Sequence, residues 1–284
     1  MATDTVTFIG TATTLLRLGP FTLLTDPNFL HAGQRVHLGY GLMSKRRTEP
    51  ALDITQLPPL DAVVLSHLHG DHFDRVASGR LARGLPIVTT PQAARRLRRR
   101  GFFALRPLNT WDSHEWRRGS AALRITATPG QHGPGPVDRL MPDVMGSLLD
   151  LTVDGKRRLR LYITGDTLRR PFLSEIPRRF PGIDAMLIHL GGARVAGVLL
   201  TMDAGQGADA VQMIRPAVTV PIHYDDYGVF RSPLSDFLRE VRQRNLAGIQ
   251  TIRRGETLPL VAKSLATSLV AAGERRAAAP AEWH

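Results

Sequence analysis

The sequence predicts an α/β fold in which two sheets pack face to face and helices cover their outer faces. Strand-like runs outnumber helical patterns, and a meander of strands is followed by strand–helix units, an order that suits this arrangement. A length of 284 residues also fits one α/β domain that buries most of its apolar surface. We therefore expect a single domain over residues 1–263 and a short Ala-rich tail over 264–284.

The predicted strands are short apolar runs rich in β-branched residues. In chain order they cover residues 6–9, 13–18, 21–25, 62–66, 86–90, 123–128, 147–153, 159–164, 185–190 and 218–223. Helical patterns are predicted at 91–100, 204–214 and 234–245. Pro91 at the start of the first helix and Gly101 after its end are typical helix boundaries.

Residues 27–58 are predicted to form one long connection without a clean period. Connections longer than about 15 residues are uncommon in compact domains and usually form functional lids or disordered segments. This one carries apolar residues that could line a substrate groove and basic residues that could contact an anion. They are Phe29, Leu30, Leu38, Leu42, Met43, Arg35, Lys45, Arg46 and Arg47. A lid over a binding site and a solvated loop are the two interpretations.

The composition limits where the protein works and what can bind a metal. Hydrophobic residues make up 43% of the chain, yet no run of about 18 apolar residues occurs, so no transmembrane helix is expected. The first ten residues lack the basic region of a secretory signal, which favours a cytoplasmic location. Because the chain has no cysteine, imidazole and carboxylate are the metal-binding groups available.

The net charge of +12 comes mainly from arginine, in clusters such as residues 95–100 and 156–160. A field of that sign attracts phosphates, anionic lipid or nucleic acid. A generally arginine-rich surface would give the same count. Basicity therefore does not choose a ligand by itself.

The strongest local signal is the segment SHLHGDH at 66–72, a pattern too specific to be coincidental. His67 and His69 are two apart in an extended segment after a predicted strand, so their side chains can point to the same side. Gly70 permits a sharp change of direction, which brings Asp71 and His72 to a second position nearby. Two neighbouring metal sites fit this geometry better than one.

Four side chains are too few to complete two sites of about four to six ligands each. Further ligands should therefore follow other strands that end at the same edge. His132, Asp166 and His223 each come at the end of an apolar, β-rich run. A buried network of these seven groups without cations would be costly, so the pattern predicts a binuclear metal centre.

This set resembles the metallo-β-lactamase superfamily, whose members carry an H-x-H-x-D-H motif followed by a distant His, Asp and His. The match covers residues 5–225, and the resemblance implies a four-layer αββα sandwich. It also implies that His67, His69 and His132 bind one metal, that Asp71, His72 and His223 bind the other, and that Asp166 bridges them. Zinc suits imidazole and ranks first, with manganese and iron as the alternatives.

Within the superfamily, FIGTATTLL, LLTDPNF and MPDVMGSLLDL resemble the branch of N-acyl-phosphatidylethanolamine phospholipase D and the ascorbate-6-phosphate lactonase-like hydrolases. The resemblance implies a phosphodiesterase or lactonase that cleaves an ester-type bond of a small-molecule or lipid-like anionic substrate. Two divalent metal ions would activate a bridging water for that attack. Asp71 is expected to orient the nucleophile or accept its proton. Ser66 and Thr164 are expected to support the ligands.

Other polar residues near these strand ends are candidates for catalysis or substrate binding. His189 is a catalytic candidate, with a buried histidine satisfied by the backbone as the alternative. His31, Arg35 and Tyr40 on the long connection could contact substrate. Asp225 and Tyr227, close after His223, could contact substrate or simply close the turn. The residues themselves leave these alternatives open.

Two other functions compete with hydrolysis. A di-iron redox enzyme of the dioxygenase kind could use the same ligands, and metal analysis would separate it from a hydrolase. A non-catalytic nucleic-acid-binding protein could use the arginines instead, but the complete ligand set argues against nucleic acid as the partner. The oligomeric state stays open.

Overall fold

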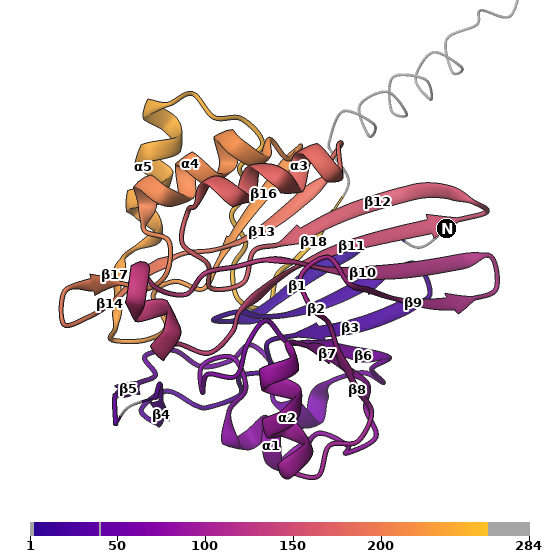
Figure 1. Cartoon of the computed structure of the whole chain (residues 1–284), viewed down its shortest axis with the longest axis horizontal. Coiled ribbons are helices and arrows are strands. Elements are labelled where there is room, and N and C mark those ends of the chain that lie inside the picture. Colours follow the sequence, from indigo (N-terminus) through magenta and orange to yellow (C-terminus); the bar gives the residue numbers. More distant parts are fainter. Residues whose placement is uncertain (1–2, 40, 261–284) are drawn as a thin grey trace, which may run out of the picture.

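Two mixed β-sheets form the centre of the molecule in the computed structural model, which describes residues 3–39 and 41–260 (Figure 1). The first sheet has the strand order β18 (Thr257–Pro259), β1 (Thr5–Gly10), β2 (Thr13–Leu18), β3 (Phe21–Thr25), β6 (Ala62–Val64), β7 (Ile87–Thr89) and β8 (Leu105–Pro107). The second has the order β16 (Val218–Ile222), β13 (Ala185–His189), β12 (Lys156–Ile163), β11 (Met145–Val153), β10 (Ala121–Pro129) and β9 (Ser113–Arg118).

Helices cover the outer face of each sheet (Figure 1). Over the first sheet lie α1 (Arg75–Arg80) and α2 (Pro91–Arg99); over the second lie α3 (Glu175–Arg179), α4 (Ala204–Ile214) and α5 (Leu234–Gln243). Short 3-10 turns occur at η1 (Ile54–Gln56), η2 (Gly135–Leu140) and η3 (Pro171–Ser174). The predicted four-layer αββα sandwich is therefore confirmed.

The layers follow from where each strand and helix places its apolar residues. Side chains alternate along a strand, and in β10 this turns Leu123 and Ile125 toward apolar residues of the first sheet such as Leu16. Helix α2 begins at a Thr90 side chain that caps the Ala93 amide, and its apolar side buries Leu97 against the first sheet. Each layer boundary is thus a continuous apolar cluster.

The predicted strands and helices are confirmed at all of their positions, with ends that shift by a few residues. The prediction that 27–58 is a single connection was wrong, because the segment contains the hairpin β4 (Arg35–His37) and β5 (Met43–Lys45). Another small sheet, β15 (Val198–Leu199), β14 (Gly191–Val195) and β17 (Phe230–Ser232), was also missed. Strands β4, β5, β15 and β17 have three residues or fewer, too short to give a sequence pattern, and β14 begins with two glycines, which are depleted in strands.

The connections after β6, β10, β12 and β16 reach one edge of the sandwich, where the predicted ligands gather. Strands β12, β13 and β16 are parallel, as are β3, β6 and β7, and carboxyl ends of parallel strands meet at one edge of a sheet. No helix within 3–39 and 41–260 is long and apolar enough to span a lipid bilayer. The predicted tail, 264–284, lies outside the described residues.

Candidate metal centre

The loop after β6 supplies four of the seven predicted ligands. His67, Asp71 and His72 are buried, and His69 is partly exposed. Gly70 is required at its position, since a Cβ there would lie 2.5 Å from the carbonyl oxygen of His37. The β4 backbone therefore passes directly against this loop.

The other three predicted ligands follow strand ends far along the chain, and all three are buried. His132 follows β10, Asp166 follows β12 and His223 follows β16. Asp166 is preceded by Gly165, whose φ of +63° lies in a region that L side chains rarely adopt. His223 itself has a φ of 62°, and its amide donates to the Thr11 carbonyl at 2.7 Å. The turn between β1 and β2 thus holds this ligand in place.

Three imidazoles form one half of the centre, here called the three-imidazole half. The Nδ1 atom of His69 lies 3.1 Å from Nε2 of His67 and 3.1 Å from Nε2 of His132. These three nitrogens converge on one point, because all three pairs lie within 4.8 Å. Nitrogen donors in this arrangement suit a divalent cation.

Asp71, His72, Asp166 and His223 form the other half, here called the carboxylate half. His72 Nε2 lies 3.1 Å from Asp166 Oδ2, and His223 Nε2 lies 3.5 Å from Asp71 Oδ2. Asp166 Oδ2 is also 4.0 Å from Nε2 of both His67 and His132. Asp166 therefore lies between the two halves.

The opposite edges of the imidazole rings are held by hydrogen-bond partners. Nδ1 of His132 is 3.0 Å from the Leu200 carbonyl oxygen, and Nδ1 of His223 is 3.2 Å from that of Leu190. A carbonyl oxygen can only accept, so each Nδ1 donates, which leaves Nε2 unprotonated and aimed at the centre in a neutral ring. Such support is typical of metal-binding histidines.

Ser66 and Asp26 support two of the three histidines of the loop, His67 and His72. Ser66 Oγ lies 3.0 Å from His67 Nδ1, and His72 Nδ1 lies 3.1 Å from Asp26 Oδ2. Asp26 in turn accepts from the Ser66 amide at 2.7 Å. The supporting contacts expected of Ser66 are present, whereas Thr164 bonds to His189 instead of a predicted ligand.

The two halves have opposite protonation behaviour. Burial lowers the pKa of His69 to about 3 and holds the pKa of His67 well below its usual range. Burial would also lower the pKa of His72, but the carboxylates of Asp166 and Asp71 outweigh it and raise that pKa well above the ordinary value. The carboxylate half thus holds protons where the three-imidazole half does not.

Unpartnered polar atoms show that the seven residues fit metal ions. Buried Asp71 Oδ1, Asp166 Oδ1 and His223 Nε2 have no hydrogen-bond partner among the described residues. Burying a polar atom without a partner costs free energy, and a cation bound by these atoms would remove that cost. Carboxylate oxygen and imidazole nitrogen are also donors that divalent metals prefer.

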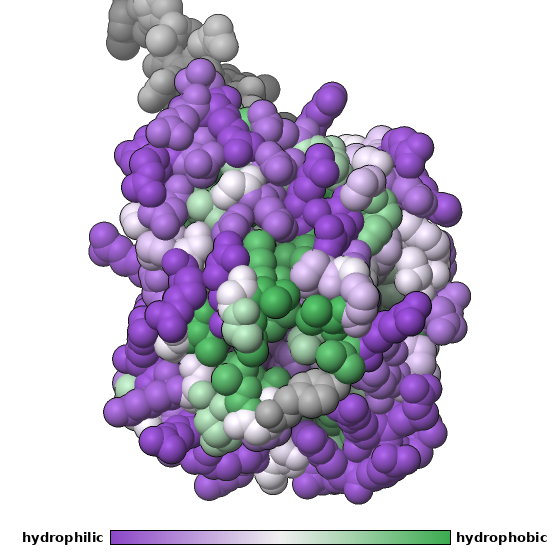
Figure 2. Space-filling model, turned by 60° about the vertical axis from the view of Figure 1, so that its left-hand side comes forward, coloured by the Kyte–Doolittle hydropathy of each residue, from purple (hydrophilic) through white to green (hydrophobic). Residues whose placement is uncertain are grey.

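A cavity of about 480 Å³, here called the metal chamber, opens above the ligands. His69, Asp71, Asp166 and His223 lie in its floor, and most of its remaining lining is apolar. That lining comes from Leu38, Leu42, Val137, Leu140, Met141, Ala193, Val195, Val198, Leu200, Val229 and Phe230. Figure 2, which brings the side with β4, β5, β14 and β17 forward, shows a hollow bordered by hydrophobic residues within a hydrophilic surface. The chamber therefore suits an apolar group next to the metals.

The long connection lines the site only in part. Leu38 and Leu42 line the metal chamber, as expected of a lid. Phe29 instead belongs to the core cluster under the first sheet. Arg46 is fully buried, and its Nη1 donates to the Asn28 carbonyl oxygen at 3.0 Å. The expectation that Arg46 contacts an anion on a lid was therefore wrong, since the side chain is structural.

The predicted substrate-binding residues are spread over several places. Arg35 lines a second cavity beside the metal chamber. His31 lies on a separate exposed surface and pairs with Glu49 at 2.7 Å. Tyr227 is buried and donates to Asn28 Oδ1 at 3.0 Å. Neither His31, Tyr227 nor Asp225 lines the metal chamber, and their roles in substrate binding stay predictions.

Tyr40 lies outside the described residues. His189, the second catalytic candidate, is fully buried behind the carboxylate half, and its Nε2 lies 3.4 Å from Asp26 Oδ2. It does not line the metal chamber. Its catalytic role also stays a prediction.

Sequence reasoning missed the chamber wall formed by η2 and the β14–β15 hairpin. Leu140 is 57% exposed at the mouth of the chamber. Together with Val137 and Met141 it follows His132 by only a few residues, and proximity to a predicted ligand was the one available signal. Val195 and Val198 likewise lie a few residues after His189, the catalytic candidate.

Comparisons with known proteins agree with this geometry. A family model described as "Beta-lactamase superfamily domain" matches residues 22–224, a span that includes all seven of the converging residues. Over 261 residues the chain is 26% identical to a UPF0173 metal-dependent hydrolase from Thermus thermophilus, with 90% of this chain and 98% of that protein covered.

Two solved structures share the fold. An isothiocyanate hydrolase from Delia radicum gut bacteria gives a TM-score of 0.77 at 22% identity, covering 91% of this chain and 100% of that one. CmlA, a diiron β-hydroxylase from Streptomyces venezuelae, gives a TM-score of 0.65 at 17% identity, covering 91% of this chain and 54% of that one. At these identities the likeness establishes the fold alone, and the fold accommodates more than one chemistry.

Proposed function

Since the chain belongs to the beta-lactamase superfamily and is a metal-dependent hydrolase of the metallo-β-lactamase fold, we propose that it uses two divalent cations to cleave an ester-type bond. The bond is a phosphodiester or a lactone, as in the branch that the sequence resembles. The substrate is a small, anionic or lipid-like molecule. Zinc ranks first as the metal.

The observation that supports two cations is the convergence of seven donors in two groups. Three neutral imidazoles, those of His67, His69 and His132, would hold one cation. Asp71, His72 and His223 would hold the other, and Asp166 between the groups would contact both. Three atoms of this set, Asp71 Oδ1, Asp166 Oδ1 and His223 Nε2, are buried without a hydrogen-bond partner among the described residues.

Two cations held there would lower the pKa of a water molecule between them and polarise the bond under attack. The chain itself would orient and deprotonate that water. Asp71 suits this role because it lies in the chamber floor and its Oδ1 has no hydrogen-bond partner among the described residues. We therefore propose Asp71 as the catalytic residue that accepts a proton.

His189 would act differently, as a positioning residue. It lies 3.4 Å from Asp26, and Asp26 in turn contacts His72 at 3.1 Å. Because His189 does not line the metal chamber, its effect on the reaction would pass through the orientation of His72.

The metal chamber supports a substrate with an apolar part. Its wall consists mostly of aliphatic side chains, while the polar residues concentrate at the metal ligands. Apolar walls also exclude water from the reacting bond, which strengthens electrostatic stabilisation of the transition state. An acyl chain or a compact lactone ring would fit such a wall.

The test is metal analysis of the purified protein together with a hydrolysis panel of phosphodiesters, lactones and β-lactams. We expect about two zinc ions per chain and turnover of at least one phosphodiester or lactone. Asp71→Asn should abolish that turnover while the circular dichroism spectrum stays that of the parent.

Iron as the bound metal, with oxygen consumption and no hydrolysis, would instead show a di-iron redox enzyme. Turnover of Asp71→Asn within a few-fold of the parent would contradict the role of Asp71.

A further inference from the structure

A second cavity, of about 790 Å³, adjoins the metal chamber. The two share His69, Gly39, Leu140 and Met141 in their linings, so they meet beside a predicted metal ligand. Five arginines from four separate segments line the second cavity, which is here called the arginine groove. They are Arg35 of β4, Arg75 of α1, Arg96 and Arg100 at the end of α2, and Arg139 of η2.

The arginine groove has almost no negative charge of its own. Asp74 is the one carboxylate in its lining, and that carboxylate accepts from the backbone amides of Leu30 and Ala77 at 2.7 and 2.8 Å. Within the described part of the chain, none of the five arginines forms an ion pair. Like charges gathered in a concave surface concentrate a positive potential, which an anion would neutralise.

Some arginines elsewhere in the protein are paired with carboxylates. Arg118 pairs with Asp61 at 2.6 Å, and Arg160 pairs with Asp150 at 2.7 Å. The absence of such partners in the groove therefore distinguishes it from those surface positions.

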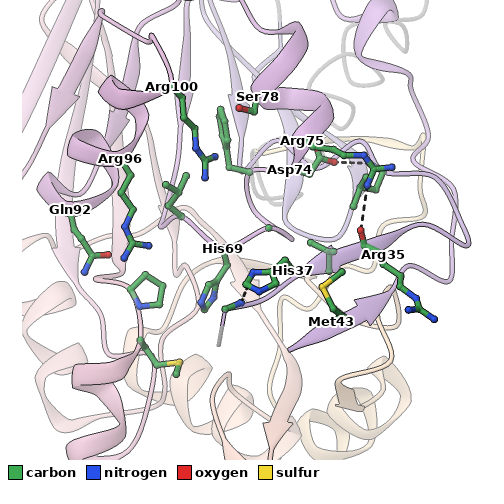
Figure 3. A pocket seen from close by; sticks show the side chains of 18 of the residues that line it. Arg35, His37, Met43, His69, Asp74, Arg75, Ser78, Gln92, Arg96 and Arg100 are labelled. Carbon is green, nitrogen blue, oxygen red and sulfur yellow. Dashed lines mark hydrogen bonds between the residues drawn. The ribbon is translucent and has the colours of Figure 1, made fainter. Parts of the chain in front are cut away.

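Arg96 and Arg100 are the best-placed pair. They are four residues apart, so they lie on the same side of α2, and their guanidinium groups point into the space beside His69 (Figure 3). Partial burial, followed by the charge of Arg96, lowers the pKa of Arg100, which agrees with two guanidinium groups close together. Planar guanidinium groups bind phosphate or carboxylate through paired, charge-assisted hydrogen bonds.

We propose that the arginine groove binds a non-reacting phosphate or carboxylate group of the substrate while the metal chamber holds its apolar part. That the bound group belongs to a substrate rests on the proposed function. Anion binding by the groove does not depend on it. The substrate is then an amphiphile whose charged end lies on the far side of His69 from its apolar end. The anionic group in the groove does not contain the bond that is cleaved.

The direct test is calorimetric titration of the purified protein with inorganic phosphate. The variant Arg96→Gln/Arg100→Gln removes two groove charges. Arg95→Gln/Arg99→Gln removes two exposed charges with the same spacing from the same helix, and neither Arg95 nor Arg99 lines the groove. We expect phosphate affinity to fall about tenfold or more in the first variant and to stay within twofold in the control.

Phosphate could also bind at the metal centre, and this would appear equally in all three proteins. Equal affinity in the two double variants therefore overturns the proposal. Both pairs are exposed, so matching unfolding temperatures are expected and would exclude misfolding as the cause.

The second test distinguishes a phosphate from a carboxylate as the group that the groove binds. Hydrolysis of a neutral 4-nitrophenyl ester is compared with that of the same ester carrying a phosphate, or a carboxylate, at the far end of its acyl chain. In Arg96→Gln/Arg100→Gln, the ratio of kcat/KM for the charged to the neutral ester should fall about tenfold. A fall for one charged ester identifies the group, and an unchanged ratio for both overturns the proposal. If no ester is hydrolysed, the phosphate titration alone decides on the groove, and the panel of phosphodiesters and lactones decides on the proposed function.

Discussion

The three-imidazole half and the carboxylate half of the candidate metal centre share Asp166 as a neighbour but differ in charge. Burial keeps His67, His69 and His132 unprotonated, because their pKa values fall below the ordinary one. In the carboxylate half the pKa of His72 is raised, mainly by the charge of Asp166 against the opposing effect of burial. The three-imidazole half can therefore accept a cation as it is, whereas the carboxylate half must first release protons.

The largest effect is expected from Asp166→Ala, since Asp166 Oδ2 lies between the halves. Both cations should be lost, and kcat/KM should fall about 10³-fold or more, because the cations supply several kcal/mol of transition-state stabilisation. Metal content after dialysis and initial rates measure this. Asp143→Ala, at an exposed aspartate, is the control. Full metal content in Asp166→Ala would show that the halves are independent.

A smaller, one-sided effect is expected from His132→Ala, which removes a donor from the three-imidazole half only. About one cation per chain should remain, and kcat/KM should fall roughly 10²-fold to 10³-fold. The metal content of His132→Ala is measured together with that of His72→Ala, which removes a donor from the opposite half. Loss of both cations in each variant would show that the halves fill only together.

The protonation difference predicts how pH affects metal binding. A raised pKa means that His72 is protonated at neutral pH in the metal-free protein, so a cation entering the carboxylate half must displace that proton. Affinity of this half should fall as the pH is lowered, and roughly one or two protons should be released per cation. The lowered pKa values of the three-imidazole half predict almost no release near neutral pH. Calorimetry in two buffers with different ionisation enthalpies counts the protons, and equal release from both halves would contradict the difference.

The smallest effect is expected from His189→Gln. The change should weaken metal binding about 10-fold to 100-fold in the carboxylate half alone, because His189 contacts Asp26, the partner of His72, and its ring packs against those of His72 and His223. A competitive chelator titration measures each site. Equal weakening of metal binding in both halves would point to a general loss of packing. The control is His114→Gln, on β9 away from the metal chamber.

The sequence was sufficient to predict the sandwich and the converging residues, for physical reasons. The predicted strands at 62–66 and 218–223 are mostly apolar, and His67 and His223 come directly after or at their ends. A motif that is local in sequence, such as residues 67–72, needs no knowledge of packing to be found. His132, Asp166 and His223 could be added because strand ends meet at a common edge.

What the sequence could not predict depends on tertiary contacts. Arg96 and Arg100 sit in a basic run in which Arg95 and Arg99 face solvent, and only the neighbouring segments determine which pair lines a groove. Arg46 gave the opposite error: it stands in an exposed-looking loop, yet Asn28 provides buried acceptors for its guanidinium. The β4 and β5 strands are three residues each, too short for alternation to be visible.

The positions of the ligands in the fold have a mechanical consequence. The loop at 67–72 extends from β6 of the first sheet, while His132, Asp166 and His223 extend from β10, β12 and β16 of the second. Metal bound among them would tie the two sheets together at one rim, as a cross-link does, and opening the sandwich there would require its release. The ions would thus stabilise the contact between the two sheets as well as take part in catalysis, and both roles would belong to the same site.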